Sequence, residues 1–155
     1  MYQNKYNKPF TPRKPVKTFR DLDIYQKTLE CSVIITKNLR PKLVLQKYLF
    51  LEGVTNCAMS VPLFIAEAHS IRFGNFALGL SLLEKSMSDC NKMIVYLEHI
   101  KGLYGSKVDT DLIDDLISRY DISRTKSFHL ELSWKKFSTP VRGAPTDEKI
   151  KNFKY

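Results

Sequence analysis

Cysteine is scarce in this sequence, and the common motifs of catalysis and phosphate binding are missing. The three cysteines, Cys31, Cys57 and Cys90, show no CxxC spacing and lie in apolar helical patterns, which predicts free thiols in a reducing compartment. The three histidines are far apart, without HxxxH or HxxE spacing. No GxSxG elbow and no glycine-rich phosphate loop occurs. We therefore expect a protein that is not an enzyme, with no catalytic residue, no cofactor and no metal.

Long apolar runs are also missing. The chain carries no charge between Gly53 and Ala66, but this run is shorter than the roughly 20 apolar residues that cross a bilayer. The positive charges at the amino terminus are not followed by an apolar segment, as they are in a signal peptide. Three prolines in the same region oppose an amphipathic membrane helix. We expect a cytoplasmic protein without membrane contact.

Acidic residues are absent from positions 1–17, although the whole chain has a net charge of +9. This segment holds the basic residues Lys5, Lys8, Arg13, Lys14 and Lys17. A second basic segment, 138–155, includes Arg142. Prolines in both segments oppose regular structure. We predict a flexible basic arm at 1–17, one nearly neutral folded domain at 18–137, and a flexible basic tail at 138–155.

The first predicted helix follows Thr18, whose spacing to Asp21 is close to a capping box. It runs to about Asn38 and ends at the break Arg40-Pro41-Lys42. Its main apolar stripe is Leu22, Tyr25, Leu29 and Val33, widened by Ile24, Cys31 and Ile35.

The second predicted helix spans 44–68 and is the most apolar segment of the chain. Its seam is Val44, Tyr48, Leu51, Thr55, Ala58, Pro62 and Ile65. We expect a kink at Pro62 and a turn around His69 and Ser70.

Two further helices complete the predicted body. The third spans about 73–103, with the seam Phe76, Leu80, Leu83, Met87, Cys90, Ile94 and Leu97. The fourth begins near Asp109, and the sequence allows a break near 121–126 because Ser123, Thr125 and Ser127 lower helix propensity. Short connections favour antiparallel neighbours, so the expected fold is an all-α, antiparallel up-and-down four-helix bundle.

Three blocks of the sequence carry a family resemblance. SVPLFIAEA (60–68) resembles the SIPxNIAEG signature of the four-helix-bundle family that includes the 23S ribosomal RNA intervening-sequence proteins. TFRDLDIYQK (18–27) is similar to the opening FxDLxVWQK of that family, and KSMSD (85–89) to its GSLxE block. The matching positions are Phe19, Asp21, Leu22, Tyr25, Gln26, Ser60, Pro62, Ile65, Ala66, Glu67 and Ser86.

The resemblance implies a homopentamer with a nucleic-acid-related role and no known catalysis. Related bundles act as accessory proteins of the reverse transcriptases of diversity-generating retroelements, so a ribosomal RNA setting and a reverse-transcriptase partner both follow from it. The chain departs from the family at Gly53, Thr55 and Asn56, where relatives have a Gln and paired Arg, and at Phe64 and Ala68. For Glu67 we expect hydrogen bonds that hold the next turn or a neighbouring helix.

Basic residues interleaved with aromatic ones suit structured or single-stranded RNA, because cations neutralise phosphates and rings stack on unpaired bases. Besides the terminal residues named above, the candidates are Arg20, Arg119, Arg124, Lys126, Lys135 and Lys136. A solubilising role for the terminal segments is the alternative. The basic end of the last helix can equally complement the helix dipole. A scaffold that docks a partner protein without binding nucleic acid is the second functional hypothesis.

Overall fold

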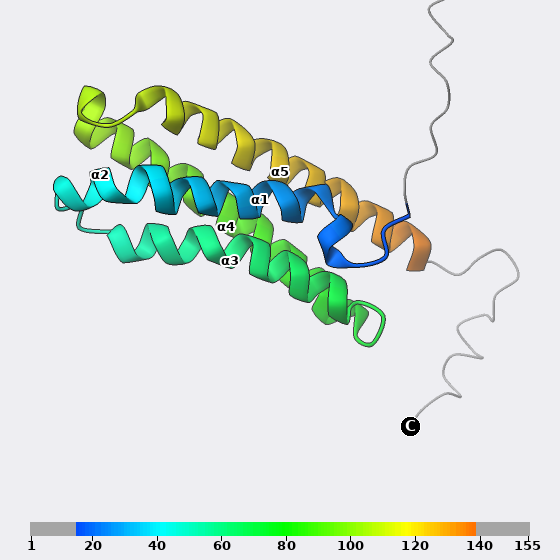
Figure 1. Ribbon diagram of the computed structural model, residues 1–155. Helices are drawn as coiled ribbons and strands as arrows, with labels where there is room; N and C mark the ends of the chain where they lie inside the picture. Colours follow the sequence, from blue (N-terminus) through cyan, green and yellow to red (C-terminus); the bar gives the residue numbers. More distant parts are fainter. Residues whose placement is uncertain (1–14, 139–155) are drawn as a thin grey trace, which may run out of the picture.

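The computed structural model describes residues 15–138, which form an all-helical bundle (Figure 1). This range contains no strand. Its elements are η1 (Phe19–Asp21), α1 (Asp23–Ile34), η2 (Ile35–Leu39), α2 (Arg40–Leu45), α3 (Leu51–Ile71), α4 (Phe76–Tyr104), η3 (Gly105–Lys107) and α5 (Thr110–Ser138). The predicted all-helical class is confirmed. Residues 1–14 and 139–155, most of the predicted arm and tail, lie outside the described residues.

The core lies between four helical segments, because α1, η2 and α2 follow one another without a break. Helix α3 packs on α4, α4 packs on α5, and α1 packs on both α3 and α5. The largest buried side chains include Ile35, Ile65, Leu83, Leu116 and Tyr120, one or more from each segment. Within residues 15–138, none of the helices combines the length and the apolar character that crossing a bilayer requires.

The predicted break at Arg40-Pro41-Lys42 is wrong, because the helix continues through Pro41 to Leu45. Proline lacks the N–H that an α-helix needs and crowds the preceding turn. Here the preceding segment, η2, is a π-helix in which the N–H of Arg40 reaches back five residues to the carbonyl of Ile35. This wider turn accommodates Pro41 inside the helix. The chain reverses instead at residues 46–50, where Lys47 has a positive φ of 53°.

The buried face of α1 is rotated away from the predicted main stripe. Val33 is 43% exposed, whereas Thr28 and Ser32 are buried. Both hydroxyls donate to backbone carbonyls of the same helix, Thr28 to Ile24 and Ser32 to Leu29, at 2.7 Å each. Because their hydrogen bonds are made locally, these polar side chains can face the core at little cost.

Helix α3 begins later and ends later than predicted. Val44 belongs to α2 and is exposed, so the first part of the predicted seam is wrong. The carboxyl-terminal part of the predicted seam is confirmed, since Ala58, Pro62 and Ile65 are buried in α3. The expected turn around residues 69–70 is also wrong. The helix continues to Ile71, and the turn follows at residues 72–75.

The last two helices largely follow the predicted pattern. Helix α4 starts at Phe76 rather than residue 73, because the Asn75 side chain accepts the N–H of Leu78 as an N-cap. On the predicted seam, residues 83, 90 and 97 are buried. Helix α5 is continuous through 121–126, and the buried Ser127 hydroxyl donates to the carbonyl of Ser123 at 2.8 Å.

Candidate nucleic-acid interface

Aromatic and basic side chains gather at one end of the bundle. Here the described chain starts, the turn between α3 and α4 closes, and α5 ends (Figure 1, right). We call this region the aromatic-basic end, and it comprises Lys17, Phe19, Arg20, His69, Arg72, Phe73, Phe76, Trp134 and Phe137. The flanking segments 1–14 and 139–155 are covalently joined to the chain at this same end.

Arg72 lies at the centre of this end as the C-cap of α3. Its Nη1 donates to the carbonyl of His69 at 2.7 Å. The guanidinium carbon lies 4.1 Å from the ring centroid of Phe73 and 5.2 Å from that of Trp134. Burial lowers the pKa of Arg72, but an arginine stays charged in proteins. The Arg72 cation therefore lies within cation–π distance of two aromatic rings.

The position of Arg72 is fixed from both sides of the turn. The N–H groups of Gly74 and Asn75 both donate to the carbonyl of Ile71, at 3.0 and 2.8 Å. Gly79 of α4 packs against the backbone of Arg72 so closely that an added Cβ would lie 2.9 Å from the Arg72 Cα. The absence of a side chain at position 79 therefore lets α4 approach the end of α3.

Two grooves open beside Arg72. The first, of about 390 Å³, is lined by Arg72, Phe73, Phe76, Trp134, Phe137 and Ser138. The second, of about 400 Å³, is lined by Lys17, Thr18, Phe19, Arg20, His69, Ser70, Arg72 and Phe73. The first is predominantly apolar, whereas three basic residues, Lys17, Arg20 and Arg72, line the second. Because Arg72 and Phe73 line both, the two grooves are adjacent.

His69 contributes an unusual polar group to the second groove. The residue is 8% exposed, and its Nε2 has no hydrogen-bond partner within the described chain. Burial, followed by the neighbouring Arg72 charge, lowers the pKa of His69. The imidazole is therefore neutral at pH 7, with one ring nitrogen that can still form a hydrogen bond.

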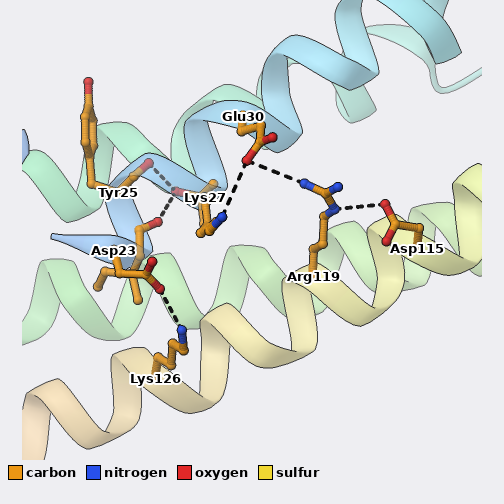
Figure 2. Close-up of polar contacts among 9 residues, drawn as sticks. Asp23, Tyr25, Lys27, Glu30, Asp115, Arg119 and Lys126 are labelled. Atoms are coloured by element: carbon orange, nitrogen blue, oxygen red, sulfur yellow. Dashed lines mark hydrogen bonds and ion pairs between the residues drawn. The ribbon is translucent and has the colours of Figure 1, made fainter. Parts of the chain in front are cut away.

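Two of the predicted nucleic-acid contacts on α5 form ion pairs with acidic residues on the side of the bundle. Figure 2 shows Lys126 paired with Asp23 at 2.7 Å. Arg119 lies between Asp115 at 2.8 Å and Glu30 at 3.5 Å. Their charges are compensated locally, which makes them poorer phosphate ligands than unpaired cations.

The remaining candidates on α5 are also near acids or near the end of the helix. Arg124 pairs with Asp121 at 3.4 Å, and Lys135 with the buried Glu131 at 3.2 Å. Lys136 is exposed in the last turn. The dipole interpretation of this basic run accords with its position at the carboxyl end of α5.

Of the other predicted nucleic-acid contacts, only Lys17 and Arg20 lie within the described residues. Arg20 stacks over Phe19, with its guanidinium carbon 5.0 Å from the ring centroid. Within residues 15–138, neither Lys17 nor Arg20 forms an ion pair with a carboxylate. The structure thus brings both to the aromatic-basic end. Lys5, Lys8, Arg13, Lys14 and Arg142 lie outside the described residues.

The first block of the family-like motif shapes this end. The Asp21 carboxylate accepts the N–H groups of Lys17 and Thr18, which lowers the pKa of Asp21 and completes the capping box of η1. Gln26 Nε2 donates to the carbonyl of Arg20 at 2.7 Å. These bonds fix the backbone that carries the two cations.

Three aromatic or apolar positions of the same block complete the anchoring. The rings of Phe19 and Tyr25 meet edge to face, 4.9 Å apart, and Leu22 is buried. The start of the bundle is therefore held by packing as well as by backbone capping.

The second and third blocks meet between α3 and α4. The Ser60 hydroxyl donates to Asp89 Oδ2 at 2.6 Å, and Lys92 lies 3.3 Å from the other carboxylate oxygen. Ser86 donates to the carbonyl of Leu83 within α4. Pro62 and Ile65 are buried, and Ala66 is half-buried. These positions pack the helices together.

Glu67 does not act as expected. It is exposed, and within residues 15–138 it forms no hydrogen bond or ion pair. The turn that it was expected to hold lies further along the chain, because α3 continues to Ile71.

The cysteine thiols are free, and the protein environment does not activate them. Burial raises the pKa of Cys31 and Cys57 to about 11 and that of Cys90 to about 12. At neutral pH all three thiols stay protonated, and the thiolate is the nucleophilic form.

Sequence reasoning missed the centre of the candidate interface. None of Arg72, Phe73, Trp134 and Phe137 is among the site residues predicted from the sequence, and His69 is predicted only as a turn residue. One sequence feature could have indicated this site. Basic and aromatic residues are adjacent in the sequence at two places, Arg72-Phe73 and Lys135-Lys136-Phe137.

No known protein family, curated protein or solved structure matches the chain. The resemblance to the intervening-sequence proteins therefore remains a hypothesis based on the three sequence blocks.

Proposed function

We propose that this chain is a non-catalytic, homo-oligomeric RNA-binding protein that contacts RNA through the aromatic-basic end. The observation that carries the proposal is Arg72, a cation without a carboxylate partner in the described chain that lies within cation–π distance of both Phe73 and Trp134. Guanidinium and aromatic planes are the groups on which unpaired bases stack, and lysine and arginine neutralise phosphates.

The distribution of charge supports the same surface. The basic segments 1–14 and 139–155 join the bundle at this end, whereas the cations on the side of α5 are paired with acids. Each segment alone would bind RNA weakly. In an oligomer, many copies act together, and weak contacts become multivalent.

The finer architecture belongs to the same proposal. The connections at residues 46–50 and 72–75 are short, which favours an antiparallel up-and-down bundle with flexible basic ends. The resemblance implies a pentamer and a setting with ribosomal RNA or with a retroelement reverse transcriptase. Sedimentation analysis of the purified chain tests the number of subunits.

The test of RNA binding compares the full chain with a variant that lacks residues 1–14 and 139–155. This truncation leaves Lys17 and Thr18 in place, so the capping of Asp21 survives. We expect an RNA affinity that falls steeply with salt and drops strongly on truncation, while the oligomer persists. An affinity that is insensitive to salt, or unchanged by truncation, would contradict the proposed role of the basic segments.

A protein-docking scaffold is the second candidate, and one observation favours it. Leu45 and Leu49, at the opposite end of the bundle, are 80% and 85% exposed. Exposed apolar side chains that cluster on a surface mark sites of protein interaction. Capture of a partner that resists nuclease and is lost in the double variant Leu45→Ser and Leu49→Ser, together with no RNA binding by the pure protein, would favour the scaffold.

A further inference from the structure

We propose that the aromatic-basic end is a binding site for one unpaired nucleotide of a single-stranded nucleic acid. Its base enters the apolar groove beside Phe73, Trp134 and Phe137, and its phosphate faces Lys17 and Arg20 in the adjoining groove. This inference rests on the proposed function, and it specifies the ligand that the site takes.

The apolar groove has the shape and chemistry of a base-stacking site. Its volume of about 390 Å³ falls in the range of about 300–1,000 Å³ found for small-molecule sites. Phe73 and Phe137 are 87% and 84% exposed, so within residues 15–138 most of the surface of both rings is free of contacts. One exposed aromatic ring is ordinary, but two rings that line one groove together with Trp134 form a platform.

The adjoining groove supplies the charge for a phosphate. Lys17 and Arg20 line it from the start of the described chain, and Arg72 lines it from the end of α3. The neighbouring carboxylate of Asp21 is already occupied by two backbone N–H groups. Three cations beside this one carboxylate leave a net positive charge for an anion.

His69 forms part of the wall of the charged groove and is more than nine-tenths buried. Its Nε2 is enclosed and has no hydrogen-bond partner within residues 15–138. A buried polar atom without a hydrogen bond is costly, so this wall is a costly part of the fold in the absence of a ligand.

The shared wall of the two grooves explains why the nucleotide must be unpaired. Arg72 and Phe73 line both grooves, so a base on the platform has its phosphate within the charged groove. In a duplex the faces of the bases are covered by stacking neighbours, and side chains cannot reach them. The site therefore favours single strands, loops and ends over helical regions.

Trp134 makes the inference directly testable, because it is the only tryptophan of the chain. The full chain is titrated with a short oligouridine strand and with a blunt RNA duplex of equal length. Intrinsic tryptophan emission is recorded together with the anisotropy of a label on the RNA. We expect the single strand to bind more tightly and to quench Trp134 by stacking, and the duplex to leave the emission unchanged.

Variants separate stacking from charge. Phe73→Ala and Phe137→Ala are each expected to weaken binding of the single strand about tenfold, within the range seen for loss of one base–aromatic stack. Phe128→Ala is the matched control, because Phe128 is an exposed phenylalanine of α5 that lines neither groove. Lys17→Ala is expected to reduce the salt dependence but to preserve the quenching at saturation.

The outcomes distinguish this inference from the proposed function. Equal affinity for strand and duplex, with unchanged Trp134 emission and no effect of Phe73→Ala, overturns the nucleotide site while RNA binding stands. Failure to bind either RNA overturns both. A parallel titration with oligothymidine identifies the source of the nucleotide: equal quenching supports a site for any single strand, and weaker quenching supports a site that also reads the ribose hydroxyl.

Discussion

Replacement of Gly79 by alanine tests the packing that positions Arg72. An added Cβ would lie 2.9 Å from both Cα and Cβ of Arg72 and 3.3 Å from the carbonyl oxygen of Ala68. Two of these three atoms belong to the backbone, so the end of α3 must move. Overpacking of this kind costs about 1–3 kcal/mol, whereas the gain in helix propensity is at most about 1 kcal/mol. We expect Gly79→Ala to lower the free energy of unfolding by about 1 kcal/mol.

Gly102 of the same helix provides the matched control. It is exposed, and an added Cβ would meet no heavy atom within 4 Å. Gly102→Ala should therefore raise the free energy of unfolding by about 0.5–1 kcal/mol through helix propensity alone. The assay is urea unfolding followed by far-ultraviolet circular dichroism. If both variants are stabilised to the same extent, the close approach between α4 and Arg72 is not a constraint.

The same pair of variants connects stability with the candidate interface. Because the two atoms closest to the added Cβ in Gly79→Ala belong to Arg72, this variant should also bind single-stranded RNA more weakly than Gly102→Ala does. The comparison is made well below the unfolding transition, so that both proteins are fully folded.

Three further results are expected. Tyr120→Phe should raise the free energy of unfolding by about 1 kcal/mol, measured by urea titration, because the buried Tyr120 hydroxyl has no partner in the described chain. A hydrogen bond with Glu131, then its charge, raises the pKa of Glu84, so this contribution to stability is present at low pH and is lost as pH rises through the raised pKa. Relative to Glu84→Gln, the wild-type melting temperature should therefore increase as pH falls from neutral through the raised pKa of Glu84, and a constant difference would contradict this coupling. Arg20→Ala should reduce the slope of log RNA affinity against log salt by about 0.7, whereas Lys126→Ala, which removes a cation already paired with an acid, should change the slope less.

The sequence was sufficient to predict the helical class and much of the core. The seam residues 83, 90 and 97 of α4 and the Ala58, Pro62 and Ile65 face of α3 are buried as the periodicity indicated. These positions follow from apolar spacing alone, which is the strongest signal in a sequence.

The errors arose where packing overrides a local rule. Pro41 should end a helix by its own chemistry, but the π-helical turn before it leaves room for its ring and its missing N–H. Thr28 and Ser32 face the core because their hydroxyls bond to the backbone of their own helix. A pattern of apolar residues does not predict the burial of a polar residue whose hydrogen bond is made within its own helix.

The candidate interface was predicted only in its charged part. Lys17 and Arg20 were identified from their composition, but Arg72, Trp134 and Phe137 belong to segments that are far apart in sequence. Only the folding of α5 beside the turn at 72–75 brings them together. Their positions in the sequence do not indicate that these three residues lie close together.

Pro15 and Ser138, the two limits of the described chain, lie at the same end of the bundle, and the turn at residues 46–50 lies at the other (Figure 1). This layout decides how the molecule should be handled on a sensor chip or a bead. A fusion tag attached directly at residue 15 or residue 138 would stand beside the grooves and obstruct incoming strands. Coupling through a cysteine introduced at Lys47 would instead orient every copy with its grooves facing the solution.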